Sequence, residues 1–145
     1  TMENHIEEKY DFDFLEVGIQ EQCNTKPHHE YLKSKGAHVI FLKDLYSHGR
    51  FKLKNFTSFL EDNDLNDREC FLSIDIDAFS NAYAPGCSQS FSLGLEPPSF
   101  FAMFEYILKQ NSVNQIGIYE VSPPLDLDDH TSKLAALIAY KYLYA

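Results

Sequence analysis

Four short apolar segments alternate with helix-like stretches along the chain, and this alternation constrains the fold more than any other feature. The expected strands cover residues 12–19, 37–42, 69–75 and 115–121. Most of them are nearly continuous apolar runs, which is typical of strands that are covered on both faces. Repeated strand–helix alternation predicts a mostly parallel sheet with helices on both faces, an α/β architecture.

Four stretches carry the signals of helices: residues 28–36, 51–63, 97–111 and 130–145. The first of these stretches follows Pro27 and ends in Gly36, a typical helix stop, and the Pro97–Pro98 pair suits a first helical turn. A chain of 145 residues has the length of about one domain. Because ligands of open parallel sheets bind beyond the carboxyl ends of the strands, we expect the chemistry of this chain at that edge.

Charge and cysteine usage narrow the range of partners. The chain has 12 basic and 22 acidic residues and a net charge of −10, so nucleic acid is not an expected partner. No apolar run approaches the roughly 18 residues that a membrane helix needs. Cys23, Cys70 and Cys87 form no C-x-x-C pair, which indicates reduced thiols that pack as small buried side chains. We therefore expect a cytoplasmic protein with no membrane partner.

Asp-x-Asp pairs occur at 11/13, 62/64, 75/77 and 126/128, and chance alone predicts about one. The first pair lies at the start of an expected strand, the second in a polar turn, and the last before a helix, whose N-terminus favours acids. Asp75 and Asp77 instead end an apolar strand, and residues two apart in an extended chain point the same way. Neighbouring carboxylates repel each other unless a proton or a cation neutralises them, and oxygen ligands suit Mg²⁺ or Mn²⁺. The alternative is a pair that faces solvent.

Glu120 ends the fourth expected strand, in the segment GIYEVSPP (117–124). An acid there would project into the same crevice as the aspartate pair, because the carboxyl ends of parallel strands meet at one edge. The alternative is an acid that faces a loop. The Pro85–Gly86 pair predicts a tight turn close to Asp77.

Together these segments resemble the ureohydrolases, the family of arginases, agmatinases and formimidoylglutamases. The segment SIDIDAFSNAYAPGCSQS (73–90) is similar to the third metal-binding motif of that family, and residues 116–143 are similar to its closing segment. FLEVGIQEQCNT (14–25) and the Ala-Tyr-Ala-Pro-Gly run at 82–86 resemble the formimidoylglutamase branch. Residues 87–90 and Ser122 depart from the usual pattern, which leaves arginase and agmatinase activity as alternatives.

The resemblance implies an arginase-like three-layer αβα domain and metal-dependent hydrolysis of a linear amidine C–N bond. The favoured reaction converts N-formimidoyl-L-glutamate to L-glutamate and formamide, a step of histidine degradation. Two Mn²⁺ ions in the complete active site would activate water. By resemblance, Asp75 and Asp77 are metal ligands, Asp77 and Glu120 are catalytic, and Glu120 also pairs with the cationic nitrogen of the substrate. Gln20 and Asn24 are expected to bind the amino-acid end of the substrate.

Two earlier motifs of the family, Gly-Gly-x-His and Asp-x-His-x-Asp, have no match in this sequence. Residues 1–145 are therefore expected to be the C-terminal portion of a single ureohydrolase-like domain whose N-terminal metal-binding half is absent. Such a chain alone should bind Mn²⁺ weakly and hydrolyse nothing. A small-molecule amidine is the expected substrate. Two further partners are considered: a second copy of the chain, which would form a homo-oligomer, and the missing N-terminal half as a separate polypeptide.

Other readings of the Asp75–Asp77 pair belong to different functional classes. A manganese-dependent sugar-nucleotide transferase also places Asp-x-Asp at a strand end, but it needs neither Glu120 nor the Pro-Gly turn. A phosphatase of the aspartyl-phosphate type wants Thr or Val where this chain has Phe79. A degenerate domain kept for binding is the non-catalytic alternative.

Overall fold

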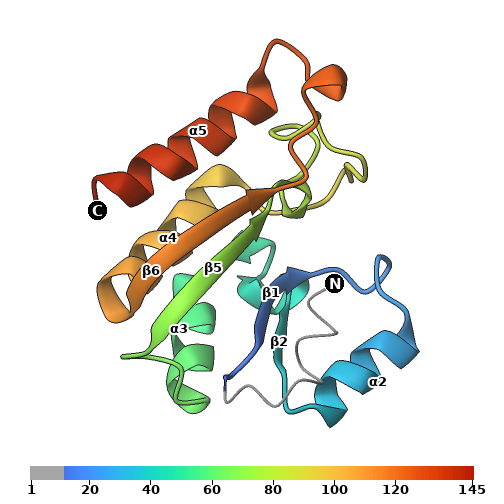
Figure 1. Ribbon diagram of the computed structural model, residues 1–145. Coiled ribbons are helices and arrows are strands. Elements are labelled where there is room, and N and C mark those ends of the chain that lie inside the picture. The colour runs from blue at the N-terminus through green and yellow to red at the C-terminus, as the bar shows by residue number, and fades with distance from the viewer. Residues whose placement is uncertain (1–11) are drawn as a thin grey trace.

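The structure is a computed structural model that describes residues 12–145 (Figure 1). Its strands are β1 (Leu15–Ile19), β2 (His38–Phe41), β3 (Tyr46–Ser47), β4 (Arg50–Phe51), β5 (Glu69–Asp75) and β6 (Ser112–Tyr119). Its α-helices are α2 (Lys26–Ser34), α3 (Leu53–Asp62), α4 (Pro97–Gln110) and α5 (His130–Leu143). Strands and helices alternate as the sequence predicts, apart from the short β3–β4 hairpin, and the α/β class is confirmed. No helix among these residues is long and apolar enough to cross a membrane.

The strands form two separate parallel pairs instead of the single sheet that the sequence predicts. Within residues 12–145, β1 pairs with β2, and β5 pairs with β6. The register of the second pair sets Asp75 opposite Tyr119, so both strands end at the same level. The arrowheads of β1 and β5 point toward the same end of the molecule in Figure 1. The residues that follow all four strands therefore lie along one edge.

Helix boundaries follow local stereochemistry. Helix α2 starts at Lys26, two residues before the expected start, with Pro27 in its first turn. It ends where Gly36 adopts a left-handed φ of +78°, a conformation that glycine takes at little cost. Helix α4 likewise begins with its two prolines.

A hydrophobic core joins the helices to the β5–β6 pair. Its fully buried side chains include Phe56 of α3, Ile76 just after β5 and Ile138 of α5, and Met103 and Phe104 of α4 complete the contact. Burial alternates along β5: Leu72 and Ile74 turn toward this core, whereas Phe71 and Asp75 are exposed. The expectation that this strand is covered on both faces is thus wrong for residues 12–145, because only one of its faces meets the core.

Candidate active site

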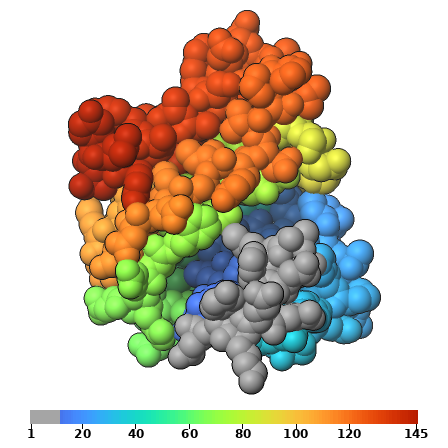
Figure 2. Space-filling view, viewed as in Figure 1, coloured from blue at the N-terminus to red at the C-terminus, as the bar shows by residue number. Residues whose placement is uncertain are grey.

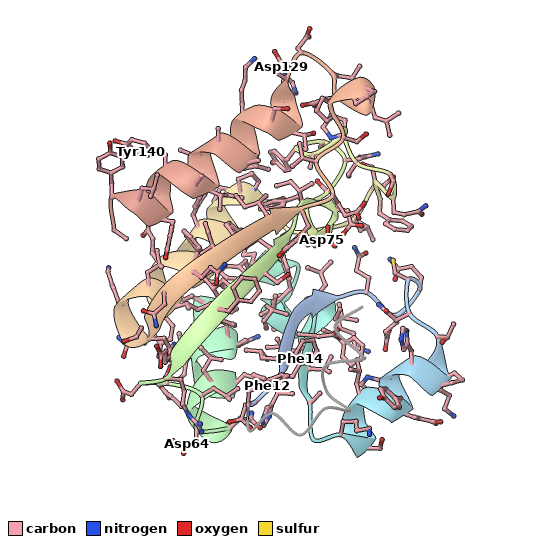
Figure 3. The ribbon with its side chains drawn as sticks, in the orientation of Figure 1. Phe12, Phe14, Asp64, Asp75, Asp129 and Tyr140 are labelled. Atoms are coloured by element: carbon pink, nitrogen blue, oxygen red, sulfur yellow. The ribbon has the colours of Figure 1, made fainter. Side chains whose placement is uncertain are left out.

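Asp75 and Asp77 lie together at the carboxyl end of β5. Asp75 is the last residue of the strand, and a short 3₁₀ turn, Ile76–Ala78, follows it. The turn is anchored by buried Ile76, and the Asp77 backbone N–H donates to Asp75 Oδ1 at 3.3 Å. Side-chain sticks in Figure 3 show Asp75 at the tip of the strand, on the side toward β1.

Glu120 follows β6 directly and completes a group of three acids. Its backbone has φ +64°, a left-handed conformation that costs a non-glycine residue free energy and is often found at functional positions. Burial, the neighbouring charge of Asp75 and then the charge of Glu120 raise the pKa of Asp77 to about 6. The three acids predicted from the sequence therefore do share one edge, and they are close enough to influence one another.

Two loops hold Glu120 in place beside the aspartates. Ser88 Oγ donates to Glu120 Oε2 at 3.0 Å. The Gly86 carbonyl accepts a 2.7 Å hydrogen bond from the Ser122 N–H, and the Gly86 N–H donates to buried Thr131 Oγ1 at 2.7 Å. The loop after β5 is thus hydrogen-bonded to the loop after β6 and to the start of α5. The sequence predicts the turn at Gly86 but not these partners.

Asp126 anchors the same region at the start of α5. It accepts hydrogen bonds at 2.9 Å from the Thr131 and Ser132 N–H groups and from the Ser132 hydroxyl. Burial alone would raise the pKa of Asp126, but these hydrogen bonds lower it well below its usual range. The sequence predicts that acids before this helix stabilise its N-terminus, and the Asp126 carboxylate does so by accepting hydrogen bonds from two N–H groups of the first turn. Of the first Asp-x-Asp pair, the structure describes Asp13, and Asp11 lies outside the described residues.

Two cysteines border the acids. A small loss of hydration and then the charge of Asp77 raise the pKa of the Cys23 thiol, although its side chain is exposed. Burial chiefly raises the pKa of Cys87, and Asp77, Asp75 and Glu120 add to the effect. All three cysteines of the chain are free, but the prediction that each is buried is wrong: Cys23 is exposed and Cys70 is partly buried.

Gln20 and Asn24 belong to the loop that carries Cys23 but line depressions that do not include the acids. Gln20 Nε2 donates to the Leu93 carbonyl at 3.0 Å and lines a depression of about 370 Å³. Asn24 lines another, of about 280 Å³, beside His28 and His29. Neither depression is lined by Asp75, Asp77 or Glu120. The proposed role of Gln20 and Asn24 in substrate binding stays a prediction.

The chemistry of the three acids fits part of a divalent-cation site. Burial and then the charges of Asp75 and Glu120 raise the pKa of Asp77, and a bound cation would relieve the repulsion between the carboxylates. Within residues 12–145, however, no group of three or more His, Cys, Asp or Glu side chains is arranged to hold a metal ion. Asp75 and Asp77 can thus supply carboxylate ligands, but a full coordination shell needs further groups.

Sequence comparison finds relatives over nearly the whole chain. The model of the arginase family matches residues 1–144. Formimidoylglutamase of Legionella pneumophila (strain Lens) is 33% identical over 137 residues, which are 94% of this chain and 42% of that protein. Formimidoylglutamase of Streptococcus gordonii is 35% identical over 133 residues, or 90% of this chain and 39% of that protein. The chain thus spans about two fifths of the length of these curated relatives.

Structural comparison finds the same fold in larger proteins. The crystal structure of formimidoylglutamase from Bacillus subtilis superposes with a TM-score of 0.75 and 29% identity, covering 86% of this chain and 38% of that one. A crystal structure of Trypanosoma cruzi formiminoglutamase with Mn²⁺ gives a TM-score of 0.73 at 23% identity and covers 88% of this chain and 41% of that one. The second likeness concerns the fold alone.

Proposed function

Because the chain belongs to the arginase family, we propose that it forms part of a metal-dependent hydrolase that cleaves the C–N bond of a linear amidine. One observation carries this proposal: the ends of β5 and β6 bring Asp75, Asp77 and Glu120 to a single edge. The curated relatives named above favour N-formimidoyl-L-glutamate as the substrate and L-glutamate and formamide as the products. Family membership gives no support to a sugar-nucleotide transferase or an aspartyl-phosphate phosphatase.

Asp75 and Asp77 would hold the metal. Mn²⁺ is the proposed ion, two per complete active site, because carboxylate oxygens suit it. When bound, such a pair of ions lowers the pKa of water and so supplies a nucleophile at neutral pH. These residues would hold and orient the metal: the turn after β5 is anchored by buried Ile76, and its hydrogen bond from the Asp77 N–H to Asp75 Oδ1 keeps the two residues together.

Glu120 would bind the cationic amidine nitrogen of the substrate. Ser88 occupies Glu120 Oε2 and so fixes the rotation of the carboxylate, which leaves Oε1 to accept a charge-assisted hydrogen bond. A carboxylate held in one orientation pays less entropy when the substrate binds. The neighbouring loop with Gln20 and Asn24 is the proposed contact for the amino-acid end of the substrate.

The complete reaction should need more protein than this chain contains. Two carboxylates do not fill the coordination shells of two metal ions, and the relatives are more than twice as long. We expect the isolated chain to bind Mn²⁺ weakly and to release no formamide. We place the active assembly in the cytoplasm, with the remaining part of the domain as a partner. A homo-oligomer is the second proposed form of assembly.

The experiment is a substrate panel for a full-length form, in which this chain is joined to the remaining part of an arginase-family domain. Release of formamide from N-formimidoyl-L-glutamate is compared with release of urea from arginine and agmatine, in the presence of Mn²⁺. We expect formamide release to dominate, and Glu120→Gln to abolish it. Urea release from arginine or agmatine would select one of the alternative activities, and a folded protein inactive on all three substrates would support a degenerate binding domain.

A further inference from the structure

The segment that joins β6 to α5 is hydrogen-bonded to a single glycine of the loop after β5. Ser122 donates its N–H to the Gly86 carbonyl at 2.7 Å, and Gly86 donates its own N–H to Thr131 Oγ1 at 2.7 Å. In Figure 2 the yellow loop after β5 adjoins the orange segment after β6 at the surface. Segment 122–131 therefore holds the Gly86 backbone by both its N–H and its carbonyl group.

Asp126 lies within this segment and contacts both the glycine and the threonine that binds it. Its carboxylate accepts hydrogen bonds at 2.9 Å from the Thr131 N–H, the Ser132 N–H and the Ser132 hydroxyl. A hydrogen bond with the Thr131 side chain also helps to lower the pKa of Asp126. A Cβ atom added to Gly86 would lie 2.6 Å from Asp126 Cβ, so the two backbones are packed tightly.

The partners of the Thr131 hydroxyl fix the direction of its one proton. An ionised carboxylate only accepts hydrogen bonds, so the proton points to Asp126 and a lone pair is left for the Gly86 N–H. An amide at position 126 offers a donor as well as an acceptor and does not impose this direction. Thr131 is fully buried, which limits replacement of a lost partner by water. Asp126→Asn should therefore weaken the contact between Thr131 and Gly86.

The loop that contains Gly86 also carries the hydrogen-bond partner of Glu120. Ser88 lies two residues after Gly86, and its hydroxyl donates to Glu120 Oε2 at 3.0 Å. Glu120 lies two residues before Ser122 and has a φ of +64°. A non-glycine residue keeps such a conformation only when its surroundings hold it there. Gly86 is thus connected to both sides of the Ser88–Glu120 contact.

The turn between Ser122 and Asp126 is stiff enough to transmit a displacement from one to the other. It is a 3₁₀ turn, Pro123–Leu125, with hydrogen bonds from the Leu125 N–H to the Ser122 carbonyl at 3.0 Å and from the Asp126 N–H to the Pro123 carbonyl at 3.2 Å. Its two prolines have fixed φ angles. A change at Asp126 can therefore reach the backbone that follows Glu120 as well as the loop of Ser88.

We propose that Asp126 is a positioning residue for Glu120, the acid that is proposed to bind the cationic nitrogen of the substrate. It acts through Thr131 and the Gly86 backbone, which hold the loop of Ser88 against the Glu120 carboxylate. The inference rests on the proposed function for the role of Glu120. The contacts that position Glu120 do not depend on any substrate.

Steady-state kinetics of the full-length form test this role. We expect Asp126→Asn to raise KM for N-formimidoyl-L-glutamate about tenfold, by more than it lowers kcat, because Glu120 contacts the bound substrate. Asp128→Asn is the matched control and should leave both constants within about twofold, since Asp128 contacts Lys133 through its backbone carbonyl. A purely structural role would reduce the amount of active protein, which lowers kcat and leaves KM unchanged. That result would overturn the proposal.

A double-variant cycle tests whether Asp126 acts through Ser88. Ser88→Ala alone should raise KM about tenfold, because Glu120 loses a hydrogen bond that fixes its rotation. If both changes act on the same contact, KM of the Asp126→Asn, Ser88→Ala double variant should lie within about threefold of that of Ser88→Ala. Effects that multiply, to about a hundredfold rise in KM, would overturn the proposal.

The metal ligands have a different anchor and provide a second control. Asp75 and Asp77 depend on the turn with buried Ile76 and on the hydrogen bond between them. In calorimetric titration, the Mn²⁺ affinity of Asp126→Asn should therefore stay within about twofold of that of the unsubstituted full-length form. A loss of about tenfold would overturn the proposal, because Asp126 would then act on the metal ligands.

Hydrogen exchange of the full-length form gives a readout without substrate. In Asp126→Asn, the Gly86 and Ser122 amides should exchange about tenfold faster, relative to amides of β5 that report any loss of global stability. Faster exchange confined to Thr131 and Ser132 would overturn the proposal, because the effect would end at the helix. A full-length form that shows the expected exchange but hydrolyses none of the three substrates of the panel would contradict the proposed function and leave the positioning of the loop standing.

Discussion

Thr131 is a buried residue that connects the start of α5 to the loop after β5. Its side chain is fully buried, and its hydroxyl accepts the hydrogen bond of the Gly86 N–H at 2.7 Å. Thr131→Val keeps the shape of the side chain but leaves that N–H without its acceptor. Because a buried unsatisfied donor costs about 1–3 kcal/mol, we expect the free energy of unfolding in urea to fall by that amount.

Thr131→Ser is the matched control, since it keeps the hydroxyl and removes only a methyl group. The serine variant should retain the hydrogen bond and lose about 0.5–1.5 kcal/mol, as for the loss of one buried methyl group. Equal destabilisation by valine and serine would contradict the assigned hydrogen bond.

We expect Asp126 to make the thermal stability of the chain depend on pH. Its pKa in the folded chain lies below the value of about 3.9 expected in the unfolded chain. A carboxyl group with a lowered folded pKa contributes stability that is complete above its unfolded pKa and is lost as the pH falls toward the folded pKa. Wild type should therefore exceed Asp126→Asn in melting temperature by a constant margin above about pH 5, and the margin should shrink below about pH 4.

Melting curves of both proteins between neutral and acidic pH measure this margin. Asp128→Asn is the control, because Asp128 contacts Lys133 through its backbone carbonyl, which the substitution keeps. A margin for Asp126→Asn that stays constant or grows toward acid would contradict the account of its hydrogen bonds.

Contacts between individual side chains are the features that the sequence predicts least well. The position of Asp75, Asp77 and Glu120 at strand ends followed from apolar runs that stop at an acid. The Ser88–Glu120 and Gly86–Thr131 contacts join residues more than 30 positions apart, and no local pattern predicts such pairs. The exposure of Cys23 also has no local signal in the sequence, because it depends on how its exposed loop packs.

At the scale of elements, the contact between the loop after β5 and the loop after β6 positions Glu120. A Cβ atom added at Gly86 would lie 2.6 Å from Asp126 Cβ and 2.7 Å from Asp126 Cα. Because backbone would have to move, Gly86→Ala should destabilise the chain by about 1–3 kcal/mol. In the full-length form it should also reduce formamide release, since the loop that carries Ser88 shifts.

Gly49→Asn provides the comparison for Gly86. Gly49 has φ +71°, a conformation that asparagine tolerates, and an added Cβ would meet open space there. This variant should lose about 1 kcal/mol or less in urea unfolding. If Gly86→Ala were as mild as Gly49→Asn, the tight approach of the two loops would be wrong.

Strand and helix order was predictable because apolar runs and helix signals alternate within short windows of sequence. The division of the strands into two pairs was not, because pairing depends on which strands are available. The sequence predicts that segments 12–19 and 69–75 are interior strands. Among residues 12–145, each of them pairs with one other strand and is therefore an edge strand. The β3–β4 hairpin has only two residues per strand, too few for a period to show.

At the scale of the whole molecule, we propose that the pair Asp75–Asp77 binds metal and that the other Asp-x-Asp pairs do not. Both Asp75 and Asp77 stand at the edge where the strands end, beside Glu120. The pair at 62/64 has the same spacing but lies at the end of α3 and in the loop after it. The two pairs share the same spacing but differ in their positions in the fold.

Manganese binding to the full-length form tests this claim most directly, by calorimetric titration of metal-free protein with Mn²⁺. We expect the unsubstituted protein and Asp62→Asn to bind two ions per active site. Asp75→Asn and Asp77→Asn should each lose about tenfold or more in affinity while remaining folded by circular dichroism. Unchanged binding by both of these variants, or a loss with Asp62→Asn as large as theirs, would contradict the account.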